Sequence, residues 1–229
     1  MNKKYIYETH LHTSEGSACG RSRAIDIVDA YKAAGYTGII ITDHFFYGNT
    51  AVDRSLPWGE WVNGFCKGYE NALEEGNRIG LQVFFGWESG YKGTEFLIHG
   101  LDKDWLLAHP EIRDADVKTQ YELVHAGGGM VIHAHPFREA PYIPEIRLFP
   151  EYVDGVEAVN ATHSGTLTKS RCMGHPEFND RAIDYADRHQ LAKTAGSDQH
   201  STEMVYGGMV FERKLKDSRD FIKAVLGGE

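Results

Sequence analysis

Short runs of β-branched and aromatic residues alternate with longer segments of helical periodicity, and this order restricts the fold more than any other feature of the sequence. The runs predict strands at residues 5–9, 37–42, 81–87, 96–99, 130–134, 155–159, 191–195 and 208–211. The segments between them predict helices at residues 23–34, 58–78, 116–126, 177–189 and 218–226. Strands that alternate with helices are typical of a parallel α/β architecture. Seven or eight strands can close a barrel, which we predict in preference to an open sheet.

No segment of the 229 residues reads as a linker between two domains. The chain has only seven prolines and no Ser/Pro-rich, low-complexity or repeated stretch. With 41% hydrophobic residues, a chain of this length can bury one sizeable core. We therefore expect a single domain over residues 1–229.

Charge and cysteine content narrow the expected partners and compartment. A net charge of −9 argues against a basic face for a nucleic-acid polymer, although bound metal ions can still attract phosphate to an acidic protein. The first residues lack the apolar stretch of a signal peptide, and no run approaches the ~18 apolar residues of a membrane span. The three cysteines, Cys19, Cys66 and Cys172, form no C-x-x-C pair. We expect a cytoplasmic protein without a membrane contact, whose oligomeric state the sequence leaves open.

Histidine is unusually frequent, with 12 residues in the chain, and many of them directly follow predicted strands. The histidines and carboxylates at the ends of five strands are His10, His12, Asp43, His44, Glu88, His135, Asp198 and His200. In parallel α/β folds the carboxyl ends of the strands share one edge, where ligands bind and catalysis occurs. These side chains are therefore expected to meet.

Their spacing and chemistry favour a metal site. Residues i and i+2 of a strand point to the same face, so His10 and His12 can bind together, as can Asp198 and His200. Imidazoles with carboxylates suit Zn²⁺, Mn²⁺ or Fe²⁺. Each motif alone has an ordinary structural explanation, such as a helix cap or a turn. Five of them at strand ends predict a cluster of two or three ions, with Glu88 as a bridging ligand.

The ordered motifs resemble the PHP (polymerase and histidinol phosphatase) family. The resemblance rests on the segments ETHLHTSEGSACG, GIIITDH, FFGWE, GGGMVIHAHPFR and TAGSDQHS, which span residues 8–201. It implies a distorted (βα)₇ TIM-like barrel that hydrolyses phosphate esters with two or three Zn²⁺, Mn²⁺ or Fe ions. It also implies three sets of ligands: His10, His12, Glu88 and Asp198 for one ion, Glu88 and His135 for a second, and His44 and His200 for a third.

Two departures from the family pattern leave the ligand shells open. Relatives usually place a His or Asp after the first motif, often within S-D-G, whereas this chain has Thr13-Ser14-Glu15-Gly16. We expect Glu15 to substitute, with Cys19 as the poorer alternative. In the segment FLIHGLD, many relatives have a ligand histidine two residues earlier. His99 and Asp102 are the nearby candidates to complete that shell.

The resemblance predicts hydrolysis of a small phosphomonoester by a metal-activated hydroxide. Asp43 or His200 could orient water or help to protonate the leaving group. Arg138 could grip phosphate, although it could equally be a surface arginine, and His163 could contact the substrate. Weaker candidates for phosphate binding are Arg21, Arg23 and Lys169. The sequence does not choose among histidinol phosphate-like, nucleotide-like and sugar phosphate-like substrates.

Two other functions remain open. An amidohydrolase also begins with His-x-His on a barrel, but such chains are generally longer and often use a carboxylated lysine where this chain has Glu88. A non-catalytic PHP module would keep metals for stability or for binding a partner. Degenerate modules usually lose ligands, and this chain retains nearly all of them.

Overall fold

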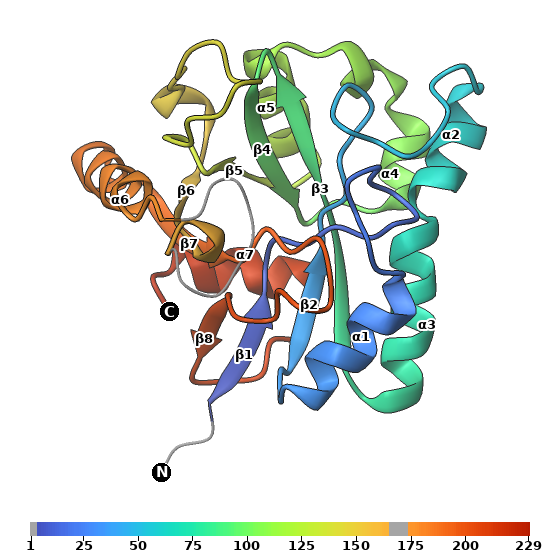
Figure 1. Ribbon diagram of the computed structural model, residues 1–229. Coiled ribbons are helices and arrows are strands. Elements are labelled where there is room, and N and C mark those ends of the chain that lie inside the picture. The colour runs from blue at the N-terminus through green and yellow to red at the C-terminus, as the bar shows by residue number, and fades with distance from the viewer. Residues whose placement is uncertain (1–3, 165–173) are drawn as a thin grey trace.

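The computed structural model describes residues 4–164 and 174–229, which form an eight-stranded sheet rolled into a nearly closed barrel (Figure 1). The strands are β1 (Tyr5–Glu8), β2 (Gly38–Ile41), β3 (Gln82–Tyr91), β4 (Thr94–His99), β5 (Met130–Ala134), β6 (Gly155–Asn160), β7 (Ala192–Gly196) and β8 (Met209–Phe211). Their order in the sheet is β7-β6-β5-β4-β3-β2-β1-β8. The predicted single-domain α/β barrel is thus the architecture that the structure has. Lys169 and Cys172 lie outside the described residues.

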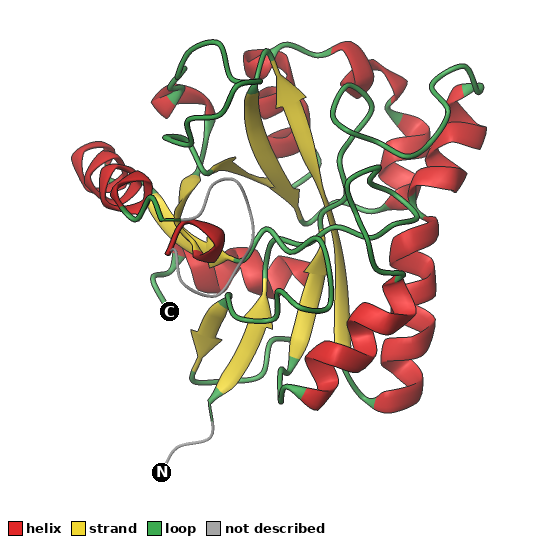
Figure 2. Ribbon diagram, viewed as in Figure 1, coloured by secondary structure: helices red, strands yellow, loops and turns green. Residues whose placement is uncertain are grey.

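Helices cover the outside of the strands (Figure 2). They are α1 (Ala24–Ala33), α2 (Trp58–Phe65), α3 (Lys67–Ile79), α4 (Lys103–Ala108), α5 (Val117–Ala126), α6 (Glu177–His189) and α7 (Ser218–Leu226), with short 3₁₀ turns at Pro110–Asp114, Pro150–Tyr152 and Ala161–Ser164. In the described ranges, no helix has the length and apolar character needed to cross a membrane.

The helix predicted over residues 58–78 is two helices, because the chain bends at Cys66. Gly64 and Gly68 flank the bend, and glycine costs about 1 kcal/mol relative to alanine inside a helix. Gly68 also sits where a Cβ atom would lie 2.2 Å from the Thr13 hydroxyl. The start of α3 is therefore packed closely against the loop that follows β1.

Two of the strands run against the parallel order. β4 is antiparallel to both β3 and β5, and β8 is antiparallel to β1. A tight turn at Lys92 and Gly93 joins β3 to β4, with φ of 52° and 87°. Positive φ at both central residues is typical of β-hairpins whose loop has two residues. The beginning of β4, rather than its end, therefore lies at the carboxyl edge of the parallel strands, and Glu88 lies within β3 rather than after it.

The ends of β1 and β7 are brought together at the carboxyl end of the barrel. Leu11 and Gln199 form an isolated parallel bridge between the segments that follow β1 and β7. The His12 amide donates to the Gln199 carbonyl at 2.8 Å, and the Gln199 amide donates to the His10 carbonyl at 3.1 Å. The Thr9 hydroxyl also donates to the Ala195 carbonyl at 2.9 Å. The first and the last strand-end motifs of the sequence are therefore neighbours.

Apolar side chains fill the barrel below this end. Leu97 of β4 is fully buried in a cluster with Tyr7, Ile132 and Phe221. Phe221 belongs to α7, so this helix closes the amino end of the barrel. This core holds in place the strands whose carboxyl ends carry the histidine and acidic side chains.

Leu97→Ala should lower the free energy of unfolding by about 2–5 kcal/mol, because removing the side chain leaves a cavity inside the barrel. Urea unfolding followed by circular dichroism measures the loss. The matched control is Leu226→Ala, because Leu226 is 53% exposed and should change stability by only about 0.5 kcal/mol. Equal losses in the two variants would contradict the interior position of Leu97.

Candidate metal centre

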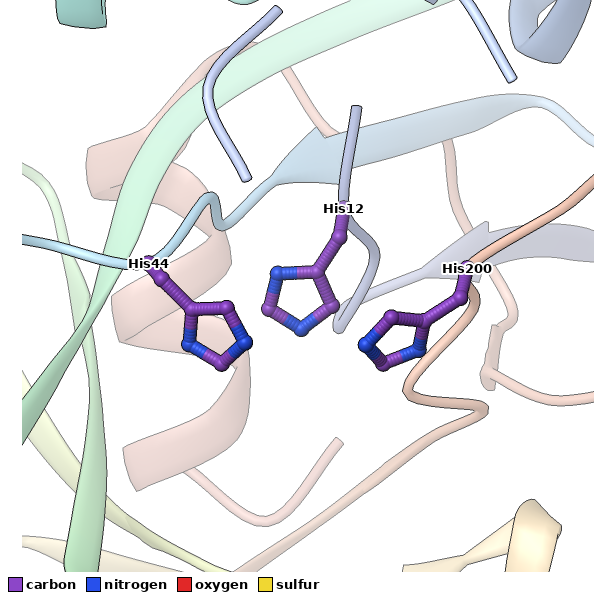
Figure 3. Close-up of side chains that lie close together, drawn as sticks. All are labelled: His12, His44 and His200. Carbon is purple, nitrogen blue, oxygen red and sulfur yellow. The ribbon is translucent and has the colours of Figure 1, made fainter. Parts of the chain in front are cut away.

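Eight histidine and acidic side chains converge where the parallel strands end. They form four overlapping groups whose nitrogen and oxygen atoms lie within 4.8 Å of one another: His12, His44 and His200; His10, His135 and Asp198; His10, His12 and Glu88; and His44, Glu88 and Glu95. Figure 3 shows the first group, whose three imidazoles come from three separate segments and lie side by side. The structure thus brings together seven of the predicted ligands and adds Glu95.

Glu88 lies at the centre of this arrangement, because both of its carboxylate oxygens face imidazole nitrogens. Oε1 lies 3.3 Å from Nε2 of His10 and 3.2 Å from Nε2 of His135. Oε2 lies 2.8 Å from Nδ1 of His44 and 3.5 Å from Nε2 of His12. A carboxylate that faces two pairs of imidazoles has the placement of a bridging ligand.

Opposite charges compensate one another in this buried cluster. Burial favours the neutral form of Glu88, but the imidazoles of His10 and His44 outweigh it and hold the pKa of this carboxyl well below its usual value. Burial also opposes charge on His10, but Glu157, Asp198 and Glu88 hold its pKa well above the usual value. Imidazole binds metals in its neutral form, so divalent ions could replace these protons as the source of positive charge.

The donors fit divalent metal ions. Nδ1 of His44 and Oε2 of Glu88 are buried without a hydrogen bond, although they lie close together. A buried polar atom without a partner costs about 1–3 kcal/mol, and a shared ligand bond would relieve that cost. Imidazoles and carboxylates are also the ligand types that Zn²⁺, Mn²⁺ and Fe²⁺ bind.

Two residues of the cluster have unusual backbone conformations. His135 has φ of 26° and Asp198 has φ of 53°. Positive φ at residues other than glycine costs about 1–3 kcal/mol and is found where the surroundings enforce it. Here the His135 amide donates to Glu157, and the Ser197 amide, next to Asp198, donates to Glu8. Buried carboxylates thus hold the backbone that aims both side chains into the site.

Glu157 supports the cluster from behind. Its Oε1 lies 2.8 Å from Nδ1 of His10, and its Oε2 accepts from the His135 amide and the Asn160 side chain, each at 3.1 Å. An ionised acceptor at Nδ1 favours the tautomer that leaves Nε2 of His10 free to bind a metal. Such outer carboxylates orient histidine ligands and raise their basicity.

Asp43 holds the loop after β1. It accepts hydrogen bonds of 2.7 Å from the Thr13 amide, the Thr13 hydroxyl and the Ser17 hydroxyl. Burial raises the pKa of this carboxyl to about 6. Its catalytic role remains a prediction, because these contacts turn the carboxylate toward the loop.

His200, the other predicted catalytic residue, lies at the edge of the cluster with its side chain 23% exposed. Its Nδ1 is 2.8 Å from the Asp198 carbonyl. Burial lowers its pKa, but Asp198 and Cys19 together outweigh burial and raise the pKa above the usual value.

Glu15 is the predicted ligand that the structure does not bring to the cluster. Its carboxylate accepts from the Ala24 amide at 3.1 Å and from the Asn71 side chain at 3.2 Å, so it caps the start of α1. Cys19 from the same loop instead lines the cavity on which His44 and His200 also lie. Burial raises the pKa of the Cys19 thiol, but its contacts with these two imidazoles outweigh burial and lower it to about 7.

Arg138 and His163, the predicted substrate-binding residues, are both buried at the site and contact each other. The Arg138 guanidinium donates to Asp198 Oδ2 at 2.6 Å and to His163 Nε2 at 3.1 Å. His163 Nδ1 lies 3.1 Å from the Asn179 side chain. Burial and the adjacent Arg138 lower the pKa of His163 to about 3. Arg138 is therefore not a surface arginine, and its guanidinium steadies Asp198.

The structure does not place His99 or Asp102 at the site, because β4 runs antiparallel. His99 ends β4 at the opposite end of the barrel, where its ring is 5.1 Å from that of Phe221. Asp102 accepts from the Trp105 amide at 2.8 Å and caps α4.

Sequence reasoning missed Glu95 and Glu157. Glu95 follows a short loop with Gly90 and Gly93 between two apolar runs, and such a loop indicates a hairpin whose second strand is antiparallel. Glu157 is the one charged residue in the apolar strand over residues 155–159, and such a residue needs a buried partner. Both signals were present in the sequence.

A cavity of about 810 Å³ opens onto the cluster. Glu88, His135, Asp198 and His200 line it on the metal side. Its wall also contains three basic residues and two tyrosines: Arg21, Lys92, Arg138, Tyr47 and Tyr142. The cavity has the size of a small-molecule site and offers positive charge to an anionic ligand.

Comparison of the sequence with known protein families gives two matches. The chain matches the family model of the PHP domain over residues 8–198 and that of the PHP-associated region over residues 176–229. It therefore belongs to the PHP domain family, as its strand-end motifs predicted. No curated protein matches the chain.

Solved structures share the fold. PsfC from Pseudomonas syringae matches with a TM-score of 0.63 and 19% identity over 97% of this chain and 88% of that one. A two-domain protein from Bacteroides vulgatus, described as containing a predicted PHP-like metal-dependent phosphoesterase, matches with a TM-score of 0.59 and 17% identity over 86% of this chain. This chain covers 52% of that protein. An amidohydrolase from Chromobacterium violaceum matches with a TM-score of 0.57 and 14% identity over 89% of this chain and 91% of that one. Identities this low show the fold alone.

Glu157→Gln should weaken zinc binding by about 10–100-fold, because the His10 imidazole loses the ionised acceptor that orients it. Competition with a chromophoric chelator measures the affinity, and circular dichroism checks the fold. Glu151→Gln is the matched control on an exposed 3₁₀ turn and should bind zinc as the unaltered protein does. Unchanged zinc affinity in Glu157→Gln would contradict the role of this carboxylate.

Proposed function

We propose that this protein is a metal-dependent phosphoesterase that hydrolyses a small phosphomonoester at a site of two or three divalent ions. The observation that carries the proposal is the position of Glu88, whose two oxygens each face two imidazoles. One carboxylate so placed can serve two ions at once, which is the arrangement that many phosphoryl-transfer sites use.

The residues divide into ligand sets around that carboxylate. The proposed sets are His10, His12, Glu88 and Asp198 for one ion, and His44 and His200 for a third. The second ion would take His135, Glu88 and Glu95, because Nε2 of His135 lies 3.2 Å from a Glu88 oxygen and 3.6 Å from a Glu95 oxygen. Bound divalent ions would lower the pKa of water to about 7 and neutralise charge on the phosphoryl oxygens. The contact of His10 Nδ1 with Glu157 and the hydrogen bond from Arg138 to Asp198 keep the ligand atoms of His10 and Asp198 aimed inward.

The cavity supports a small anionic substrate. Arg21 and Lys92 line its wall, with Arg138 beside the cluster. These cations stand out against a chain of net charge −9, so local charge rather than overall charge would attract a phosphate. The cavity volume of about 810 Å³ suits a small phosphorylated molecule better than a nucleic-acid polymer. Tyr47 and Tyr142 could pack against the remainder of the substrate.

An amidohydrolase remains the second candidate, because an amidohydrolase is among the solved structures with this fold. A carboxylated lysine is a frequent bridging ligand in that class, whereas Glu88 lies between the imidazoles here. A panel of phosphomonoesters, amides and lactones, each assayed with Mn²⁺, Zn²⁺ and Fe²⁺, separates the two classes.

His10→Ala should lose metal and phosphatase activity together, with activity falling about 100-fold or more, because the change removes a ligand rather than an outer carboxylate. Elemental analysis and turnover of p-nitrophenyl phosphate measure the two quantities. His189→Ala, on the exposed end of α6, is the control and should keep both. Full metal content with full activity in His10→Ala would contradict the site. Absence of phosphomonoester hydrolysis by the metal-loaded protein would contradict the proposed reaction.

A further inference from the structure

Arg138 is held by two contacts that use different nitrogens of its guanidinium. Its Nε–H donates to Nε2 of His163 at 3.1 Å, and its Nη2 donates to Oδ2 of Asp198 at 2.6 Å. The guanidinium is planar and presents its donors in a fixed fork, so two such contacts set the orientation of the whole group. Arg138 and Asp198 also line the cavity. His163 therefore decides, together with Asp198, how the guanidinium faces a ligand in that cavity.

The contact with Arg138 requires one particular tautomer of the His163 imidazole. Arginine can only donate, so Nε2 of His163 must carry a lone pair. Burial and the adjacent guanidinium lower the pKa of His163 to about 3, so the ring is neutral near pH 7. A neutral imidazole has two tautomers, and only the one with its proton on Nδ1 can accept from Arg138.

Asn179 of α6 selects that tautomer. Its Oδ1 lies 3.1 Å from Nδ1 of His163 and accepts from the Asn160 amide at 3.1 Å, while its Nδ2 donates to the Asn160 carbonyl at 3.1 Å. The two bonds to the Asn160 backbone fix which end of the side-chain amide is the oxygen, and that oxygen can only accept. Nδ1 of His163 must therefore donate to it. Both neighbours of the ring require the same proton position.

Burial keeps this row of hydrogen bonds in place. His163 is 1% exposed, and Asn179 and Arg138 are also buried. The Phe178 ring of the same helix packs edge-on against the imidazole, with ring centres 5.2 Å apart. Neither nitrogen of His163 is left for a substrate, because one faces Arg138 and the other faces Asn179.

We propose that His163 and Asn179 are positioning residues, which hold the Arg138 guanidinium in the orientation in which it binds the phosphate group of the substrate. This inference rests on the proposed phosphoesterase function. The two residues act through Arg138 and do not touch the substrate. Ordering a long cationic side chain when an anion binds costs affinity, and a guanidinium that is already held avoids that cost.

His163→Leu tests this role, because leucine fills a similar space without a lone pair for Arg138. In protein loaded with Mn²⁺, KM for p-nitrophenyl phosphate and the inhibition constant of inorganic phosphate should each rise about 10-fold, while kcat changes less than about 3-fold. His163→Gln has an amide oxygen that can accept from Arg138, and it should return both constants to within about 3-fold of the unaltered protein. The matched control is His175→Leu just before α6, where the side chain is 48% exposed, and both constants should stay unchanged.

A merely structural role of His163 gives a different pattern. Damage to the fold lowers the fraction of active molecules and therefore kcat, and it leaves KM and phosphate inhibition as they were. Unchanged KM and phosphate inhibition in His163→Leu would overturn the proposal, and so would a failure of His163→Gln to restore them. Absence of p-nitrophenyl phosphate turnover by the unaltered, metal-loaded protein would instead contradict the proposed function.

Neutron diffraction from crystals of the unaltered protein covers the case in which the variants do not fold or the protein does not turn over this substrate. In crystals grown from deuterium oxide, the map should show a deuteron on Nδ1 of His163 and none on Nε2. That result would support the positioning of Arg138 independently of any activity. A deuteron on Nε2 would overturn it, because the ring could then not accept from Arg138.

Discussion

The buried carboxylate of Glu8 joins the parts of the barrel on which the metal centre depends. It accepts from the amides of Thr9, His10 and Ser197 at 2.9, 3.0 and 2.9 Å, from the Tyr31 hydroxyl at 3.0 Å, and from the Ser197 hydroxyl. A fully buried carboxylate is costly unless its lone pairs are satisfied, and here the donors come from β1, α1 and the end of β7. The same hydrogen bonds that stabilise Glu8 therefore set the distance between His10 and the segment that carries Asp198.

The buried carboxylates near the metal centre, including Glu8, form two layers. Glu8 and Glu157 form the outer layer, since they bind backbone amides and the Nδ1 edge of His10. Glu88 and Asp198 form the inner layer and face imidazole nitrogens and Arg138. The outer carboxylates fix the directions of the ligands, and the inner ones concentrate negative charge at one end of a barrel. Such a concentration is stable only where cations compensate it, and divalent ions are suited to this task.

The sequence predicts what depends on local periodicity and misses what depends on distant contacts. His10, His44, His135 and Asp198 could be placed together because parallel strands share one carboxyl edge whatever their order in the sheet. The rule does not apply to β4, because the turn at Lys92 and Gly93 reverses the chain and makes this strand antiparallel. As a result Glu95 lies at the site and His99 lies at the opposite end of the barrel. Cys19 rather than Glu15 lines the cavity with His44. The sequence named both residues and could not decide this placement. The placement depends on hydrogen bonds from the loop to Asn49 and His200, which are remote in the sequence.

The most direct test of the metal centre is anomalous X-ray diffraction from crystals of the protein prepared without chelators, recorded on both sides of the zinc, iron and manganese absorption edges. We predict two or three anomalous peaks at this end of the barrel. One of them should lie about 2.0–2.2 Å from a Glu88 oxygen and from imidazole nitrogens. Crystals soaked in these metals that show no anomalous peak within bonding distance of Glu88 would contradict a metal centre bridged by this carboxylate.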